Sequence, residues 1–189
     1  WSCTQSYRFK VGDKMFLYIT GIKNKKEALS AIKKGANAIG VELGYKESAL
    51  AAENCRTWLE ELPFHILKAG IFQNEEYYNV EEMASFCHLD IIHLKDKAKL
   101  KDFSHYSGRL IVETDYQNWE GIKANGYVIK LTSVSEAKKL SVSKIKLPVL
   151  LTGNFNLHEW QDILDYYNPA GIALDYAFVN DMSKLIAYR

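Results

Sequence analysis

The sequence has no run of about 20 apolar residues, which excludes a helix long enough to span a bilayer. Cysteine is scarce: Cys3, Cys55 and Cys87 are odd in number and widely spaced. This excludes a disulfide framework and fits a reducing compartment, so we expect the cysteines to be small buried hydrophobic residues. The five histidines show no ligand spacing either, and no metal site is predicted.

An excess of charge of one sign is also missing. The formal net charge of +1 at pH 7 gives no field that would favour nucleic acid or an anionic membrane. The charged run at residues 95–102 is expected to be a solvated face. No dinucleotide-binding fingerprint or P-loop is present, and no cofactor is predicted. The first residues lack the apolar core of a signal peptide, so the cytoplasm is the expected compartment.

What the chain does contain is a regular alternation of two patterns. Eight short apolar segments predict strands at residues 15–20, 38–43, 65–72, 89–94, 109–114, 126–131, 148–153 and 170–176. Each is followed by a segment that predicts a helix or a helical turn, at residues 25–35, 49–62, 79–87, 95–103, 116–124, 133–140, 157–167 and 180–188. The first of these helices is expected to end at Gly35.

Continuous apolar strands that alternate with helices indicate a parallel sheet covered on its outside. Eight such units predict a closed (β/α)8 barrel, with an open, doubly wound parallel sheet as the alternative. At 189 residues the chain is short for a barrel, so compact loops are expected. No linker or change of composition divides it, which predicts a single domain over 1–189 with an irregular N-terminal extension at 1–13.

In such a barrel the chemistry lies where strands end and the following loops begin. The residues at these positions are Thr20, Glu42, Gln73, His93, Lys95, Glu113, Asp115, Lys130, Thr152, Asn154 and Asp175.

Four stretches then resemble the phosphoribosylanthranilate isomerase family. YITGIKNKKEALSAIKKGANAIGVEL, at residues 18–43, is similar to the family's K-I-C-G-I-T-N, amphipathic helix and G-A-D-A-[IV]-G. LPFHILKAGIFQNEE (62–76), HLDIIHL (88–94) and LLTGNFNLHEWQDILDYYNPAGIALD (150–175) are similar to later family motifs in the same order. The resemblance implies a (β/α)8 barrel and a cofactor-free Amadori rearrangement of an aminoaldose phosphate.

The resemblance also implies a Cys general base at the end of strand one and an Asp general acid at the end of strand six. Thr20 stands at the first position and Lys130 at the second. An unactivated Thr hydroxyl is too weakly acidic to form the anion that a thiol forms near neutral pH. A Lys ammonium could donate a proton there if it were buried.

The family's phosphate cradle corresponds to two turns of this chain. Gly153 is retained in the first, but Asn154 replaces the second Gly. In the other turn the family's S-S-G-V becomes residues 175–178, so that Asp175 and Ala177 replace a Ser and a Gly. A carboxylate there would repel phosphate, and the loss of Gly restricts close approach of the backbone.

These replacements predict a phosphoribosylanthranilate isomerase-like pseudoenzyme, retained as a binding or structural subunit whose partner is another protein subunit or a second copy of the chain. Such a role predicts a mouth filled by Tyr176 and Phe178 and an exposed apolar patch elsewhere. The aromatic residues at 77–78 and 166–167 are expected to pack on helices, and would mark an interface if they formed an exposed cluster.

Two enzymatic alternatives remain open. The first is an active sugar-phosphate isomerase with altered acid and base residues; it predicts an open, positively lined pocket. His93 is a further candidate base, for a different activity. The second is a Schiff-base lyase in which Lys130 is the nucleophile and Glu113 or Asp115 shuttles protons. A hydrogen-bonded structural His93, and an ion pair between Lys130 and Glu113 or Asp115, are the simpler interpretations.

Overall fold

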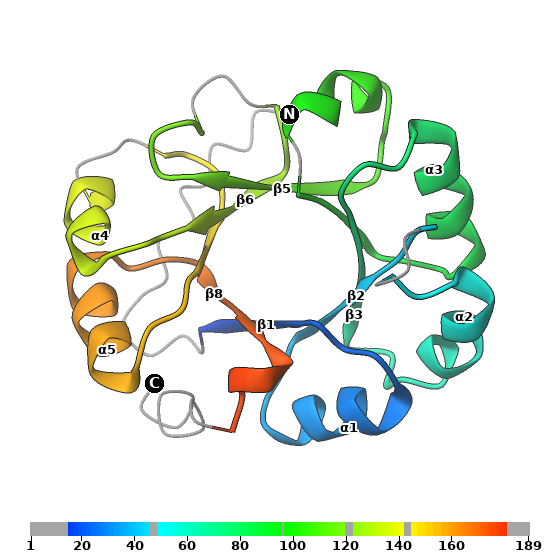
Figure 1. The fold of residues 1–189 in the computed structure, drawn as a ribbon, viewed down its shortest axis with the longest axis horizontal. Coiled ribbons are helices and arrows are strands. Elements are labelled where there is room, and N and C mark those ends of the chain that lie inside the picture. Colours follow the sequence, from blue (N-terminus) through cyan, green and yellow to red (C-terminus); the bar gives the residue numbers. More distant parts are fainter. Residues whose placement is uncertain (1–14, 46–48, 96, 120–122, 142–144, 181–189) are drawn as a thin grey trace.

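The computed structural model describes residues 15–45, 49–95, 97–119, 123–141 and 145–180. Within them, parallel strands pair in chain order and the last pairs with the first, which closes a barrel (Figure 1). The strands are β1 (Phe16–Thr20), β2 (Ala38–Glu42), β3 (Leu67–Phe72), β4 (Ile91–Leu94), β5 (Arg109–Asp115), β6 (Gly126–Lys130), β7 (Val149–Thr152) and β8 (Gly171–Asp175). The predicted (β/α)8 barrel is confirmed, and the open sheet is excluded.

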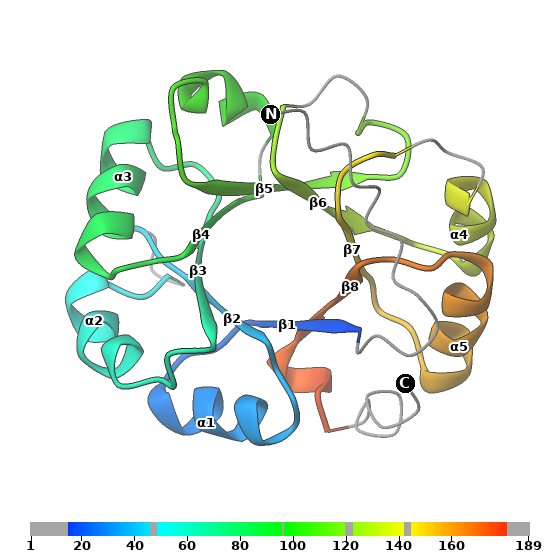
Figure 2. The same cartoon turned by 180° about the vertical axis from the view of Figure 1, so that it is seen from behind.

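The helices lie outside the ring of strands, as Figures 1 and 2 show from the two ends. They are α1 (Lys25–Lys33), α2 (Ala52–Glu60), α3 (Tyr77–Phe86), α4 (Val134–Ser141) and α5 (Leu157–Tyr166), with 3-10 helices η1 (Lys97–Phe103) and η2 (Tyr176–Phe178). None of the described helices has the length and apolar character needed to cross a bilayer.

Two of the predicted helical segments are not seen as helices in the described residues. The one at 116–124 has turns rather than a helix in its described part, residues 116–119 and 123–124, so β5 is linked to β6 without a regular helix there. The segment at 180–188 and the extension at 1–13 lie outside the described residues, apart from Asn180.

Local signals explain how α1 leads from β1 to β2. Asn24 Oδ1 accepts the N–H of Glu27 at 3.0 Å and caps the helix. Gly35 has φ 97°, and the N–H of Ala36 donates to the carbonyl of Ala31 at 3.2 Å, a Schellman ending. The predicted end of this helix at Gly35 is therefore confirmed.

Alternation along the strands separates two apolar layers. The inner layer fills the barrel and contains the buried residues Tyr18, Ala38, Ala69, Ile71, Ile91, Val128 and Ala173. The outer layer packs strands against helices and includes buried Cys55 and Cys87, as predicted, while Cys3 lies outside the described residues. At the amino ends of the strands, the described residues line an open apolar cavity of about 300 Å³. Side chains above the inner layer point into the opposite, carboxyl-terminal mouth.

Candidate active site in the barrel mouth

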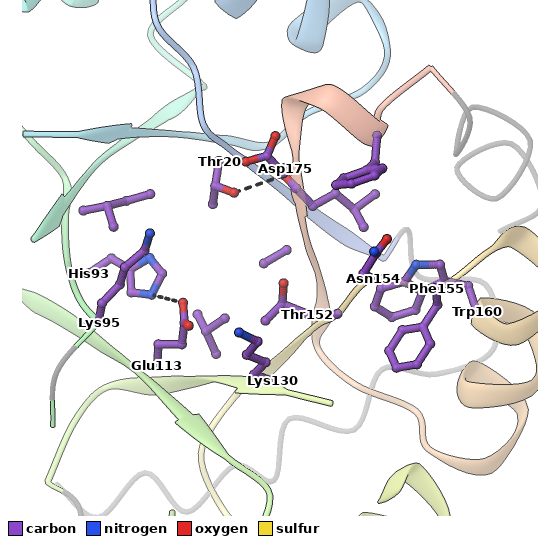
Figure 3. Close-up of a pocket in the computed structure, with 16 residues that line it drawn as sticks. Thr20, His93, Lys95, Glu113, Lys130, Thr152, Asn154, Phe155, Trp160 and Asp175 are labelled. Carbon is purple, nitrogen blue, oxygen red and sulfur yellow. Dashed lines mark hydrogen bonds and ion pairs between the residues drawn. The ribbon is translucent and has the colours of Figure 1, made fainter. Parts of the chain in front are cut away.

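The carboxyl ends of the strands surround a cavity of about 320 Å³ (Figure 3). Phe178 lies at its rim with 43% of its surface exposed, and Tyr176 packs against the outer apolar layer. Within the described residues the mouth is therefore open, and the filled mouth expected of a purely structural subunit is not observed.

Most of the predicted strand-end residues meet at this cavity. Its lining includes Thr20, His93, Lys95, Glu113, Lys130, Thr152, Gly153, Asn154 and Asp175. Glu42 and Gln73 instead line a small neighbouring cavity of about 30 Å³. The Asp115 carboxylate accepts the N–H of Gln117 at 2.8 Å and so stabilises its own turn. Ala177 is exposed in the β8 loop and is not among the lining residues.

Beneath the cavity, the buried side chain of Tyr18 on β1 contacts His93 on β4, and His93 itself lines the cavity. Tyr18 Oη and His93 Nδ1 are 3.2 Å apart, and both residues are 1% exposed. Gly40 leaves the room for this contact, because a Cβ there would lie 2.6 Å from the Tyr18 hydroxyl. Burial, and secondarily the charge of Lys95, lowers the pKa of His93 to about 3, so its ring is neutral.

The tautomer of His93 is assigned from the groups around the ring. Burial raises the pKa of Tyr18, so its hydroxyl stays protonated, but which atom donates in the contact with His93 Nδ1 depends on the tautomer. We assign the ring hydrogen to Nε2, which faces Glu113 Oε2, so that the Tyr18 hydroxyl donates to Nδ1. Among the described residues Nε2 has no hydrogen-bond partner, although Glu113 Oε2 lies 3.7 Å away. His93 is thus the hydrogen-bonded structural residue at Nδ1 and an unused donor at Nε2.

Glu113 connects this pair to the cavity. Its side chain is 25% exposed, and burial raises its pKa, an effect that Lys95 and Lys130 oppose and Glu42 reinforces. A carboxyl group with a raised pKa in a cavity is typical of residues that transfer protons.

The two lysines of the mouth differ in environment. Lys95 forms an ion pair with Glu42, whereas Lys130 is exposed and extends toward the cavity beside Glu113 and Thr152 (Figure 3). An exposed, hydrated ammonium is not the desolvated amine that a Schiff-base nucleophile needs. The geometry therefore does not favour the lyase interpretation.

Thr20 is not activated as a base. Its hydroxyl donates to the carbonyl oxygen of Leu174 at 3.3 Å (Figure 3). A carbonyl oxygen cannot take up the hydroxyl proton near neutral pH, so this contact holds the side chain without making it a nucleophile or a proton acceptor.

The β8 turn is occupied by the chain's own carboxylate. Asp175 Oδ1 accepts the N–H of Ala177 at 2.9 Å. Gly21, with φ 71°, makes this placement sterically feasible, because a Cβ there would lie 2.5 Å from Asp175 Oδ2. An incoming phosphate would therefore find the backbone N–H of Ala177 already donated to Asp175, and it would be repelled by the negative charge of that carboxylate.

The turns after β7 and β6 are closed in a similar way. The ring of Phe155 covers Gly153, where a Cβ would come within 2.3 Å of it. Glu159 accepts the N–H of Asn156 at 2.9 Å in a capping box at the start of α5. After β6, Glu136 accepts the N–H of Thr132 at 2.7 Å.

Sequence reasoning missed Phe155 and Trp160 as parts of the mouth, and Tyr18 as the partner of His93 in the layer beneath it. Tyr18 lies two residues before Thr20, so the period of two along β1 was a usable signal that both face inward. The rings of Phe155 and Trp160 pack edge to face with their centres 5.4 Å apart, and no sequence pattern predicted that contact. Among the described residues, no group of three His, Cys, Asp or Glu side chains is arranged to hold a metal ion.

Comparison with known proteins gives this geometry a context. No protein-family model matches the chain. A segment of 76 residues is 33% identical to the N-(5'-phosphoribosyl)anthranilate isomerase of Moorella thermoacetica, and it covers 40% of this chain but only 34% of that enzyme's length. A longer segment of 158 residues is 25% identical to the enzyme of the same name from Thermotoga petrophila, covering 78% of this chain and 69% of that protein.

In fold, the chain is similar to the crystal structure of phosphoribosyl anthranilate isomerase from Thermus thermophilus. The TM-score is 0.76 at 18% identity, with 92% of this chain and 97% of the other covered. The homologues and structural neighbours of this barrel are therefore phosphoribosylanthranilate isomerases.

Proposed function

We propose that this isomerase-like barrel does not catalyse the rearrangement of phosphoribosylanthranilate and instead binds a small, unphosphorylated polar molecule in its mouth. The observation that carries the proposal is the contact in the β8 turn, where the Asp175 carboxylate occupies the N–H of Ala177. The proposal agrees with the predicted loss of the isomerase reaction. It adds that the predicted binding role is exercised by the barrel mouth.

The residues at the positions of the family's acid and base support the proposed absence of isomerase activity. Thr20 stands where the family resemblance implies a Cys base, and its hydroxyl is engaged with the Leu174 carbonyl. Lys130 stands where the resemblance implies an Asp acid, and it is exposed. An exposed lysine lacks the burial that would suit it to act as the general acid at a sugar ring oxygen.

The loops after β6, β7 and β8 support the absence of a phosphate in the ligand. Backbone N–H groups at helix starts and tight turns are the usual donors to phosphate. Here the carboxylates of Glu136, Glu159 and Asp175 accept such N–H groups, and each also adds a negative charge. A dianion would have to displace several existing hydrogen bonds against this charge.

The open cavity supports ligand binding rather than a purely structural role. The exposed aromatic residues lie on separate elements, such as Tyr78 on α3 and Tyr166 on α5, rather than in one described cluster. Tyr166 is covered by Lys138 at 4.2 Å from the ring centre. An apolar docking patch is thus not supported by the described surface, and a partner subunit or homo-oligomer stays a prediction.

The direct test has two arms. The purified protein is expected to leave phosphoribosylanthranilate unconverted, and its gene to leave a strain that lacks the enzyme unable to grow without tryptophan. Inorganic phosphate, titrated into isotope-labelled protein and followed by NMR, is expected to cause no shift at Ala177 in the wild type. Turnover of the substrate or phosphate binding at Ala177 would contradict the proposal.

A pair of variants tests whether the Asp175 turn is what prevents phosphate from binding. Asp175→Ser combined with Ala177→Gly removes the charge and leaves a hydroxyl, a weaker acceptor for the N–H of residue 177. Phosphate affinity is expected to rise at least tenfold, about 1.4 kcal/mol. Asp175→Asn is the matched control, because it removes the charge but keeps an oxygen that can accept the Ala177 N–H. A gain in Asp175→Asn equal to that of the double variant would leave charge alone as the cause.

A further inference from the structure

We propose that the mouth catalyses proton transfer at the carbon next to a carbonyl group, acting on a short, unphosphorylated hydroxy aldehyde or hydroxy ketone. Glu113 is the catalytic base, Lys130 stabilises the developing oxyanion, and His93 is a positioning residue. This inference rests on the proposed function, since it names the class of the ligand bound in the same cavity.

Glu113 meets the requirements of the base. It reaches the cavity from β5, most of its side chain is buried, and that burial raises the pKa of the carboxyl group. A carboxylate with a raised pKa removes a proton from carbon more readily than an ordinary solvated one. Its neutral form can return the same proton.

His93 lies behind this carboxyl group, where a small movement would let it orient one carboxylate oxygen. It is 1% exposed and fixed at Nδ1 by the Tyr18 hydroxyl, so the Nε2 hydrogen has a set direction. Nε2 has no partner among the described residues and lies 3.7 Å from Glu113 Oε2. About 0.8 Å of movement would give a hydrogen bond of ordinary length to one carboxylate oxygen, leaving the other for the ligand.

Lys130 supplies positive charge on the adjacent strand. Glu113 is in register with Val128, so Lys130 lies two residues further along the same inward side of β6. Its charge reaches Glu113, whose pKa it lowers. Lys95 is balanced by Glu42, whereas Lys130 extends into the space between Glu113 and Thr152 (Figure 3).

The shape of the cavity limits the ligand. At about 320 Å³ it is at the small end of ligand sites and holds one small molecule. Hydroxyl and amide groups of Thr20, Thr152 and Asn154 suit a polyhydroxylated compound, while Phe155, Trp160 and Phe178 form an apolar wall. Because the loops after β6 to β8 are capped by carboxylates, the compound carries no phosphate.

The chemical step balances without a cofactor. Glu113 takes the proton from the carbon that bears the hydroxyl group, and the C–H electron pair forms the double bond of an enediolate. The former carbonyl oxygen takes the negative charge beside Lys130. Return of the proton to the former carbonyl carbon, with transfer of the hydroxyl proton between the two oxygens, interconverts aldehyde and ketone. If the proton exchanges with solvent first, deuterium enters that carbon in D2O.

The test measures this deuterium. Dihydroxyacetone, glyceraldehyde, erythrose and ribose are incubated separately with the protein in D2O, and incorporation next to the carbonyl is followed by NMR. The wild type is expected to accelerate exchange of at least one of them above the buffer rate. Glu113→Gln is expected to lower that rate by at least about 100-fold, the usual contribution of a general base. Asp165→Asn, on the exposed surface of α5, is the matched control and keeps the wild-type rate.

Two further variants separate the roles. Lys130→Met removes the charge and is expected to slow exchange about 10-fold or more. Because the charge of Lys130 also lowers the pKa of Glu113, the rates are compared on the high-pH plateau of each profile. The wild-type rate rises with pH through the raised pKa of Glu113. In His93→Gln this pH profile is expected to shift, which a purely structural loss of protein would not produce. Thermal unfolding of each variant verifies that it is folded.

Absence of exchange with all four compounds would overturn the inference, as would an undiminished rate in folded Glu113→Gln. Either result would leave the proposed function standing if the wild type still fails to convert phosphoribosylanthranilate and NMR shifts of mouth residues report binding of one of the four compounds. Conversion of phosphoribosylanthranilate by the wild type would overturn both.

Discussion

The two sides of the barrel mouth differ in whether their hydrogen-bond donors have partners. On the open side, formed by Tyr18, His93 and Glu113, a buried donor at His93 Nε2 is left without a partner next to a carboxyl of raised pKa. On the capped side, formed by the loops after β6, β7 and β8, carboxylates of the chain accept backbone N–H groups at Thr132, Asn156 and Ala177.

This difference shows which part of the mouth is poised for a ligand. A satisfied N–H group at a helix start contributes to stability, and a ligand must displace its partner to use it. A buried donor without a partner costs free energy, which a ligand or a small rearrangement can recover. The open side therefore has a polar group that a ligand can use, whereas the N–H groups of the capped side already have partners.

The largest expected effect on the open side is a loss of folding stability at acid pH, caused by His93. In the fold the pKa of His93 is about 3, against an ordinary value of 6.5. Below pH 6.5 the unfolded chain binds a proton that the folded chain binds only near pH 3, so stability falls as the pH falls through this window. The loss from this residue is about 2 kcal/mol at pH 5 and about 4 kcal/mol at pH 3. Urea unfolding across pH 3–7 measures it.

His93→Gln is the control for that measurement, because it removes the titration but keeps a polar side chain. Glu113 has the opposite sign: its raised pKa makes the folded chain bind a proton before the unfolded chain does, which favours the fold as the pH falls. The difference between wild type and His93→Gln at each pH isolates His93. Parallel pH curves for the two proteins would show that His93 is not a buried neutral ring.

The next effect tests the packing beneath the open side. A Cβ on Gly40 would lie 2.6 Å from the Tyr18 hydroxyl and 2.9 Å from the side chain of Ile71. Gly40→Ala is therefore expected to push Tyr18 away from His93 and to lower the free energy of unfolding by about 1–3 kcal/mol, as other overpacked cores do. Chemical denaturation measures the loss.

Tyr18→Phe accompanies Gly40→Ala as its control, since it removes the hydroxyl that occupies this space. The combination of the two substitutions is expected to cost less than the sum of the single ones. Strict additivity would mean that the hydroxyl is not what the new methyl group meets.

The sequence alone was sufficient for the barrel, because each apolar segment had to be buried on both faces and each therefore became a strand. It also located most of the mouth, since residues at the carboxyl ends of parallel strands meet wherever the barrel closes. Thr20, His93, Glu113 and Lys130 do line one cavity.

What the sequence could not predict depends on distances between strands. Whether Phe178 fills the mouth or lies at its rim is set by the path of the β8 loop, which η2 and the Asp175 cap determine. The pairing of Tyr18 with His93 joins residues 75 positions apart through the space above Gly40. A helix or helical turn was predicted at residues 116–124; in the described part of this segment Asp115 holds a turn at 116–117, and no helix is present.

The smallest expected effect tests the capped side. In α5, Asn156 Oδ1 accepts the N–H of Glu159 at 3.0 Å, and Glu159 accepts the N–H of Asn156 in return. Asn156→Ala removes one of these bonds and is expected to cost about 1 kcal/mol of unfolding free energy, the usual value of a helix cap. Asn156→Ser, which can still cap, should recover most of it. Because this loop is proposed to stabilise rather than to bind, Asn156→Ala should leave deuterium exchange at the wild-type rate; a loss of exchange without a loss of stability would place ligand contacts on the capped side and remove the distinction between the two halves of the mouth.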